Sequence, residues 1–185
     1  ELTGANVPFA VRARVCLLRD LGSALAPDNA FAIIQGLETV ALRMKQHCEN
    51  AEKVVNFLKK HKEVTKVIYS TEHEKKIADR AKQYLKGGNG PMVGIELKGG
   101  IEAGKKFIES LKMFYHVANI GDARSLAIHP ASTTHSQLNE KELAASGVTQ
   151  SYVRLCIGIE HIDDIIDDLD QALNKSSKGN LKAVS

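Results

Sequence analysis

Apolar residues in the first third of the chain recur at alternating steps of three and four, which is the spacing of one face of an α-helix. Asp28 or Asn29, just after Pro27, can cap the first turn, because a short side-chain oxygen accepts a hydrogen bond from an unpaired amide. The pattern predicts one long helix with a buried stripe formed by Phe31, Ile34, Leu37, Ala41, Met44, Cys48, Ala51, Val55 and Leu58.

From Glu63 onward, short β-rich runs alternate with shorter helical patterns. Asn139 and Glu142 have the spacing of a capping box, and Gly147 is placed to end the helix that they begin. The order predicts an α+β fold in which a small sheet is covered by helices on one side. We expect strands at 64–69, 92–97 and 152–159, helices at 71–85 and 102–111, and a last helix with Ile162, Ile166, Leu169 and Leu173 on one face.

The same patterns suggest how the chain is organised. We interpret residues 1–27 as a linker or the remnant of a preceding domain, residues 28–175 as one α+β domain that begins with the long helix, and residues 176–185 as a loose polar tail. The opening, Glu1–Arg14, reads as the middle of a longer chain, with Gly4, Asn6 and Pro8 in a loop. We therefore expect this chain to be a fragment.

Composition narrows the class of protein. The chain has 25 basic and 22 acidic residues scattered along 185 positions, with no basic block, so nucleic-acid binding is not indicated. The three cysteines, Cys16, Cys48 and Cys156, lie far apart, which fits a reducing, cytoplasmic setting. No apolar run approaches the roughly 20 residues of a membrane helix. We expect a soluble protein that does not bind membranes.

Arg154 is the most informative position for chemistry. In the last predicted strand, alternate residues project to opposite faces, so Arg154 points away from the apolar face, with the small residues Cys156 and Gly158 beside it. A buried guanidinium keeps its proton and needs an anionic partner, and its fork suits a carboxylate. The alternative is an exposed strand arginine paired with a surface acid.

Residues 121–137 are dense in hydroxyls and turn formers, which favours a shaped loop that could bind a ligand. The alternative is a turn-rich connection whose hydroxyls cap their own backbone. His129 and His135 lie six residues apart across a proline, which is no standard metal spacing, so no metal is expected. The residues 86–90 resemble a phosphate loop, but a strand follows them and not a helix, so we interpret them as a turn.

The acidic cluster near the C-terminus lies at the start of the last helix, beside the positive end of its dipole. We interpret it as a solvated helix face and not as a cation site. Its members are Asp163, Asp164, Asp167, Asp168 and Asp170.

Several runs together resemble the C-terminal signature of the Cys/Met-metabolism pyridoxal-phosphate (PLP) enzymes. These are Gly121-Asp122, Ser125-Leu126-Ala127, His129-Pro130-Ala131-Ser132, Thr134-His135, and residues 153–160, with further similarity upstream at 36–39 and 42–44. Within that family, the residues 13–15, 17–22, 27 and 29–31 are most similar to O-acetylhomoserine sulfhydrylases. The resemblance implies the C-terminal domain of an aspartate-aminotransferase-like (fold type I) enzyme, working as a homotetramer in methionine and cysteine metabolism.

The resemblance also implies roles for two residues. Arg154 would bind the α-carboxylate of the amino-acid substrate, and Ser125 would lie beside it in the same site. The family holds pyridoxal 5'-phosphate as a Schiff base on a lysine in a Ser-x-Thr-Lys context in a larger preceding domain, and this chain has no such run. Lys86 precedes a strand and does not fit that role. The chain alone is therefore expected to be inactive, because the cofactor works only once an amine is joined to it.

Other readings of the residues stay open. The implied reaction converts O-acetyl-L-homoserine and sulfide into L-homocysteine and acetate, but the same C-terminal motifs occur in cystathionine γ-synthase, the cystathionine lyases and methionine γ-lyase. A different class of function is a non-catalytic module of the same fold that binds a partner chain or a small carboxylate. That alternative predicts an open reading frame that begins close to Glu1.

Overall fold

The computed structural model describes residues 7–177, which fall into two compact units divided between Ala41 and Leu42. The first unit contains α1 (Pro8–Arg12), a π-helix (Ala13–Asp20) and α2 (Pro27–Glu38). Pro8 and Pro27 stand in the first turn of their helices, where a missing N–H leaves no bond unmade. Pro8 is therefore helical and not in a loop as predicted, whereas Gly4 and Asn6 lie outside the described residues.

The predicted long helix is two helices. α2 ends at Glu38, and α3 (Val40–Leu58) begins after Thr39, whose ψ of 4° has left the helical range. Thr39 and Val40 are both β-branched and lose rotamer freedom in a helix, which makes this pair a weak point in an otherwise continuous pattern. Periodicity alone could not reveal the interruption, because the apolar stripe keeps its spacing across it.

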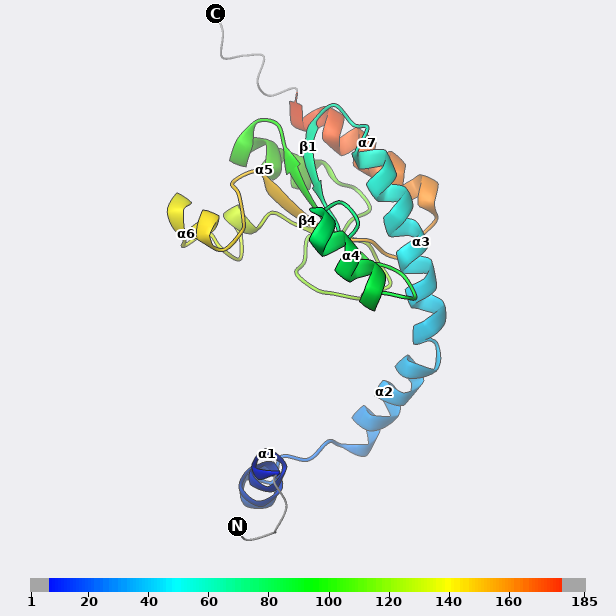
Figure 1. Cartoon of the computed structure of the whole chain (residues 1–185), viewed down its shortest axis with the longest axis vertical. Helices are drawn as coiled ribbons and strands as arrows, with labels where there is room; N and C mark the ends of the chain where they lie inside the picture. The colour runs from blue at the N-terminus through cyan, green and yellow to red at the C-terminus, as the bar shows by residue number, and fades with distance from the viewer. Residues whose placement is uncertain (1–6, 178–185) are drawn as a thin grey trace, which may run out of the picture. The chain divides into compact units, whose positions relative to one another are not determined.

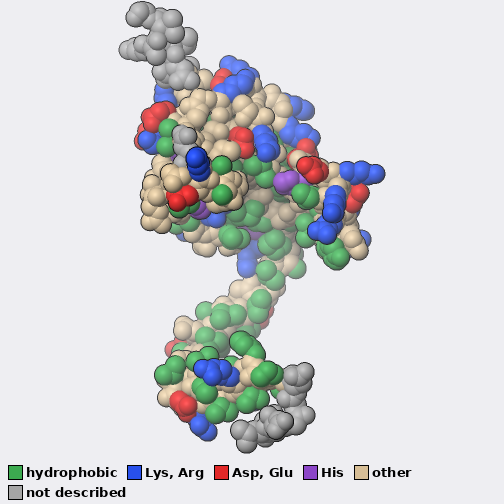
Figure 2. Space-filling model, turned by 60° about the vertical axis from the view of Figure 1, so that its left-hand side comes forward, with side chains coloured by type: hydrophobic (Ala, Val, Ile, Leu, Met, Phe, Trp, Pro, Cys, Tyr) green, Lys and Arg blue, Asp and Glu red, His purple; other side chains and the backbone are tan. Residues whose placement is uncertain are grey.

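The burial predicted for the stripe is correct only for its second half. Phe31 is 65% exposed and Leu37 60%, and none of the helices in the first unit has a buried residue. Figure 2 shows hydrophobic side chains gathered on the surface of the N-terminal unit. Cys48, Ala51, Val55 and Leu58, by contrast, are buried in the second unit.

The second unit is built on a four-stranded antiparallel sheet in the order β1-β2-β4-β3. The first two strands in the sequence lie close to their predicted bounds, and the last strand ends three residues earlier than expected. The strand β3 was not predicted, because its three residues are too few to show an alternation. The strands are β1 (Val64–Ile68), β2 (Met92–Leu97), β3 (Leu126–Ile128) and β4 (Tyr152–Cys156).

Three helices cover one face of this sheet and confirm the predicted α+β class. They are α3, α5 (Gly100–Ser110) and α7 (Ile162–Ser177), and their apolar residues form one core with the inward-facing residues of β2 and β4. Figure 1 shows α7 beside α3, and His61, just beyond α3, lies 3.5 Å from a carboxylate oxygen of Asp170 in α7. Among residues 7–177, no helix combines the length and the apolarity needed to cross a bilayer.

The remaining elements lie around the sheet. α4 (Lys75–Tyr84) is shorter than predicted, residues 86–90 form the expected turn before β2, and α6 (Glu140–Ala145) starts with the predicted capping box. Gly147 follows α6 with a φ of 78°, a left-handed conformation that glycine adopts without strain.

The burial of side chains on α7 differs from the prediction on both its apolar and its acidic face. Ile165 is fully buried where Ile166 was expected, and Asp168, predicted to be solvated, is only 6% exposed. Its carboxylate accepts hydrogen bonds from the backbone amides of residues 112–114, at 2.8–3.3 Å. Asp168 thus holds the segment after α5 against α7. The helix includes residues 176 and 177 of the predicted loose tail, and the rest of that tail lies outside the described residues.

Candidate substrate-binding site

The site is organised by the alternation of side chains along β4. Val153 and Leu155, and Ile157 just after the strand, are fully buried in the core. Tyr152 and Arg154 project to the opposite face and are half-buried. This confirms the faces predicted from the sequence, and it presents Arg154 away from the helices that cover the core.

Arg154 lies near the middle of the sheet. Its register partners are Gly94 in β2 and Ile128 in β3, so a strand flanks it on each side. No hydrogen bond or ion pair joins its guanidinium to any side chain in the part of the chain that the structure describes. A surface acid, the alternative partner considered from the sequence, is therefore not found among residues 7–177.

The loop before β3 covers the far end of β4. The thiol of Cys156 interacts with the backbone of Gly121 and lies within electrostatic range of Asp122 and Arg154. Burial raises the pKa of this thiol, since desolvation disfavours the thiolate. The loop therefore lies over the same outer face that carries Arg154.

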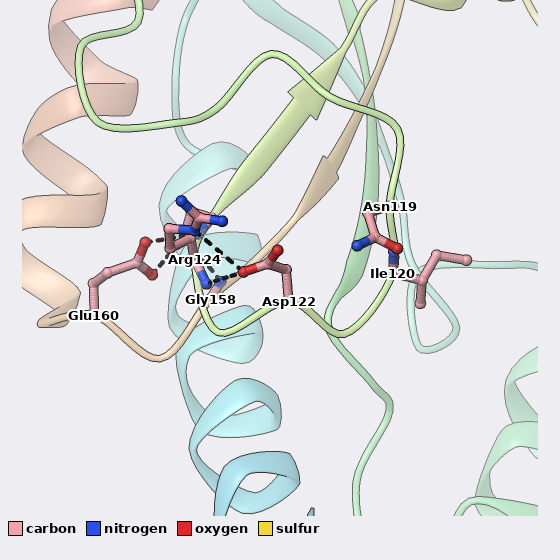
Figure 3. Close-up of polar contacts among 7 residues, drawn as sticks. Asn119, Ile120, Asp122, Arg124, Gly158 and Glu160 are labelled. Carbon is pink, nitrogen blue, oxygen red and sulfur yellow. Dashed lines mark hydrogen bonds and ion pairs between the residues drawn. The ribbon is translucent and has the colours of Figure 1, made fainter. Parts of the chain in front are cut away.

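Ser125 is fully buried and its hydroxyl is occupied within the protein. The hydroxyl donates to a carboxylate oxygen of Glu160 at 2.9 Å and accepts from the amide of Gly158 at 2.9 Å. The other oxygen of Glu160 accepts from the Ser125 amide at 2.6 Å. Figure 3 shows Glu160 and Gly158 on the connection that follows β4. No hydrogen bond joins Ser125 to Arg154 in the described structure.

Gly158 explains why small residues follow Arg154. A Cβ on Gly158 would lie 2.5 Å from the carbonyl oxygen of Ala123 and 2.5 Å from the amide nitrogen of Ser125. The 123–125 segment thus lies so close to the backbone of Gly158 that no larger residue fits at this position.

α3 holds the same connection from the other side. The Nδ1 of His47 hydrogen-bonds the carbonyl of Ile157 at 2.7 Å, and the Asn50 amide donates to the carbonyls of Gly158 and Glu160. Both side chains are essentially fully buried. The sequence did not predict the role of these two polar residues, because their hydrogen-bonding partners lie about 110 positions away.

The exposed Arg124 and the half-buried Asp122 form an ion pair beside the site (Figure 3). The guanidinium lies 4.4 Å from the centre of the Tyr115 ring, and its Nε is 3.4 Å from a carboxylate oxygen of Asp122. The backbone amide of Arg124, together with its side chain, lowers the pKa of Asp122. Arg124 is thus already paired, whereas Arg154 is not.

The loop 119–122 was only partly anticipated. Asn119 accepts a hydrogen bond from the next amide, that of Ile120, at 2.9 Å, and both residues are exposed. Figure 3 shows them on the stretch of chain that leads to Asp122. The predicted loop began at Gly121, because turn formers become dense only from that point.

The two histidines of the predicted loop have different environments. His129 is 1% exposed, and its ring nitrogens hydrogen-bond the Ser132 hydroxyl and the Gln150 carbonyl, each at 2.8 Å. Burial lowers its pKa. His135 is half-buried and hydrogen-bonds the Thr134 hydroxyl. His129 is therefore a structural residue, with no ring nitrogen left to bind a metal.

Comparisons with known proteins agree with this architecture. The chain is 52% identical over 171 residues to the O-acetyl-L-homoserine sulfhydrylase of Leptospira meyeri, and 42% identical to an L-methionine gamma-lyase of Fusobacterium nucleatum subsp. polymorphum. In each case 92% of this chain is matched, but only 39% and 43% of those relatives. The chain therefore spans about two fifths of the length of these relatives.

A solved structure extends the similarity to three dimensions. A crystal structure from Campylobacter jejuni, assigned as an O-acetylhomoserine (thiol)-lyase with a pyridoxyl-lysine phosphate, superimposes with a TM-score of 0.84 at 43% identity. It is matched over 94% of this chain and 42% of its own length. The fold is thus an α+β domain found in PLP-dependent enzymes of sulfur amino-acid metabolism.

The family is also established by its model. The Cys/Met metabolism PLP-dependent enzyme model matches residues 5–174, nearly the whole chain, and the chain belongs to that family.

Residues 7–177 do not include an enclosed lysine that would fit as the anchor of the cofactor. PLP chemistry needs a lysine amine joined to the cofactor in a site closed to water. Every lysine among residues 7–177 is exposed or half-buried, and Lys86 stands exposed on the turn before β2. Among the described residues, Arg154 is a half-buried cation without an anionic side-chain partner.

Proposed function

We propose that these residues form the C-terminal, carboxylate-binding part of a PLP-dependent O-acetylhomoserine sulfhydrylase. In this reaction sulfide displaces the acetoxy group from the γ-carbon, so that O-acetyl-L-homoserine and sulfide give L-homocysteine and acetate. PLP, bound mainly by a preceding domain, would supply the electron sink for this exchange. In the whole protein we expect a cytoplasmic homotetramer.

The guanidinium of Arg154 carries the proposal. It is the side chain that faces outward from the centre of β4, is half-buried between two neighbouring strands, and has no anionic partner among residues 7–177. A partly buried arginine without a counter-ion is costly, so an acidic ligand would bind there with a favourable charge-assisted hydrogen bond. An amino acid supplies that group as its α-carboxylate.

Ser125 belongs to the same proposal in a supporting position. Its hydroxyl ties Gly158 to Glu160, so Ser125 would shape the wall beside Arg154. The substrate carboxylate would then meet Arg154 as its cationic partner, with the 119–125 loop beside it.

Arg154→Ala in the full-length enzyme tests the proposal. We expect KM for O-acetyl-L-homoserine to rise by a factor equivalent to roughly 2–4 kcal/mol, because a charge-assisted pair with the substrate is lost. Arg154→Lys should recover only part of the loss, since an ammonium lacks the two-pronged fork. The matched control is Arg80→Ala, an exposed arginine of α4.

The same variants also report on the chemical group that Arg154 recognises. Wild-type enzyme should strongly prefer O-acetyl-L-homoserine over its carboxamide, and Arg154→Ala should remove most of that preference. An unchanged KM in Arg154→Ala would contradict the proposed role.

A lyase of the same family is the second candidate, favoured by the 42% identity to an L-methionine gamma-lyase. Assays of the full-length enzyme with O-acetyl-L-homoserine and sulfide, then with L-methionine and with cystathionine, would separate the candidates. A higher kcat/KM for methionine or cystathionine would overturn the sulfhydrylase assignment while leaving the carboxylate site intact. A protein inactive with all three would instead favour the non-catalytic module.

A further inference from the structure

Tyr152 stands two residues before Arg154 on β4, and its ring reaches over the neighbouring strand into the space where a side chain opposite Arg154 would stand. The direct partner of Arg154 in β2 is Gly94, which has no side chain. The Tyr152 ring lies over this glycine: a Cβ added to Gly94 would be 2.6 Å from Cε2 and 2.8 Å from Oη of Tyr152. The ring thus fills the space left open by the glycine.

Gly94 is needed for this space and not for its backbone conformation. It is absent from the glycines with positive φ, so the backbone at this position suits any residue. It is also buried in the middle of β2, where a glycine weakens a strand. The only property that favours glycine here is the missing Cβ, and the tyrosine ring benefits from it.

The register therefore places a neighbouring side chain on each side of Arg154. Ile128, its direct partner in β3, is 5% exposed, and the Tyr152 ring covers the β2 side. Arg154 also lies within electrostatic range of Tyr152. A guanidinium on a long flexible stem loses much rotamer freedom when it binds a ligand, and side walls that restrict the stem beforehand reduce that cost.

We propose that Tyr152, seated over Gly94, is a positioning residue that aims Arg154 at the substrate carboxylate. This inference rests on the proposed function of Arg154. Tyr152 acts through its ring, because its hydroxyl makes no side-chain hydrogen bond among residues 7–177. The substrate-facing group remains the guanidinium.

Three variants of the full-length enzyme test the role of the ring. Tyr152→Ala removes the ring, Gly94→Ala displaces it with a methyl group, and Tyr152→Phe keeps it without the hydroxyl. We expect the first two to raise KM for O-acetyl-L-homoserine about ten- to a hundredfold with kcat much less affected, because a misaimed group weakens binding. Tyr152→Phe should behave as wild type. Both damaging variants should also lose preference for the substrate over its carboxamide.

The double variant Gly94→Ala/Tyr152→Ala separates displacement of the ring from general damage to β2. If Gly94→Ala acts by moving the ring, it adds nothing once the ring is absent, so the double variant should match Tyr152→Ala. Tyr84→Ala, an exposed tyrosine of α4, is the matched control. Thermal unfolding of each variant identifies any that fails to fold, and Tyr152→Ala alone then decides.

The outcomes distinguish the two proposals. If Arg154→Ala raises KM and Tyr152→Ala does not, the positioning role is wrong and the carboxylate site stands. The positioning role is also wrong if Tyr152→Phe is as damaging as Tyr152→Ala, since the hydroxyl would then be the active group. If Arg154→Ala itself leaves KM unchanged, both proposals are overturned.

Discussion

The hydroxyl of Ser125 is used both as a donor, to Glu160, and as an acceptor, from the amide of Gly158. Its partners, Gly158 and Glu160, lie more than 30 positions away, so no local pattern could reveal them. The Arg154 face, by contrast, could be predicted because alternation along a strand is a local property. At this scale the sequence predicts the direction of a side chain better than its contacts.

Ser125→Ala should lower the free energy of unfolding by about 1–3 kcal/mol, because the buried amide of Gly158 loses its acceptor. Urea denaturation measures this change, with Ser136→Ala at an exposed position as control. A variant with wild-type stability and a raised KM would mean that the hydroxyl serves the substrate instead.

His129 should make the fold sensitive to acid. Burial lowers its pKa below the ordinary value of about 6.5, so the unfolded chain binds a proton more readily than the folded one. The stabilisation is complete above about pH 6.5 and is lost as the pH falls from there toward the lowered pKa. Unfolding free energies at pH 7.5 and pH 5 should differ less in His129→Gln than in wild type. An equal difference in both would assign the acid sensitivity to other groups.

At the scale of elements, the sequence predicts where helices and strands occur but not which apolar or acidic faces are covered. The stripe from Phe31 to Leu58 has one period, yet only its second half is buried, because coverage depends on what else packs there. Likewise, Asp168 carries the same charge as its neighbours in α7 but caps three amides of a segment more than 50 residues earlier. Strand β3, with three residues, is too short to be predicted from an alternating pattern.

Asp168→Asn should therefore destabilise the chain far more than Asp167→Asn on the exposed face of the same helix. We expect a loss of about 2–3 kcal/mol, because an amide supplies one acceptor oxygen where the carboxylate supplies two and leaves buried N–H groups unpaired. The two variants have the same change in charge, so urea denaturation of both isolates the effect of the hydrogen bonds. Equal losses would contradict the capping role.

At the scale of the whole molecule, the two units differ in how they place their apolar residues. The core lies within the second unit, whereas the helices of the first expose large apolar residues such as Phe9 and Phe31 and bury none. We expect another protein surface to pack against these helices, because large exposed apolar surfaces are typical of interaction sites.

Deleting residues 1–41 should leave the urea midpoint of the chain almost unchanged, because residues 7–41 contribute no buried side chain to the core. The shortened chain should also stay monomeric at higher concentration, since the exposed apolar helices are gone. Chemical denaturation and light scattering of the two chains measure these effects. A large drop in the midpoint would show that the first unit supports the core.

The alternation of side chains between the two faces of β4 limits how this protein can be redesigned. One strand supplies both the interior of the domain, through Val153 and Leu155, and the proposed substrate contact, through Arg154. Inserting or deleting a single residue upstream within the strand would exchange these two sets, placing a charge in the interior and aliphatic groups toward the ligand. The proposed anion-binding group can therefore be shifted along the strand only by an even number of positions.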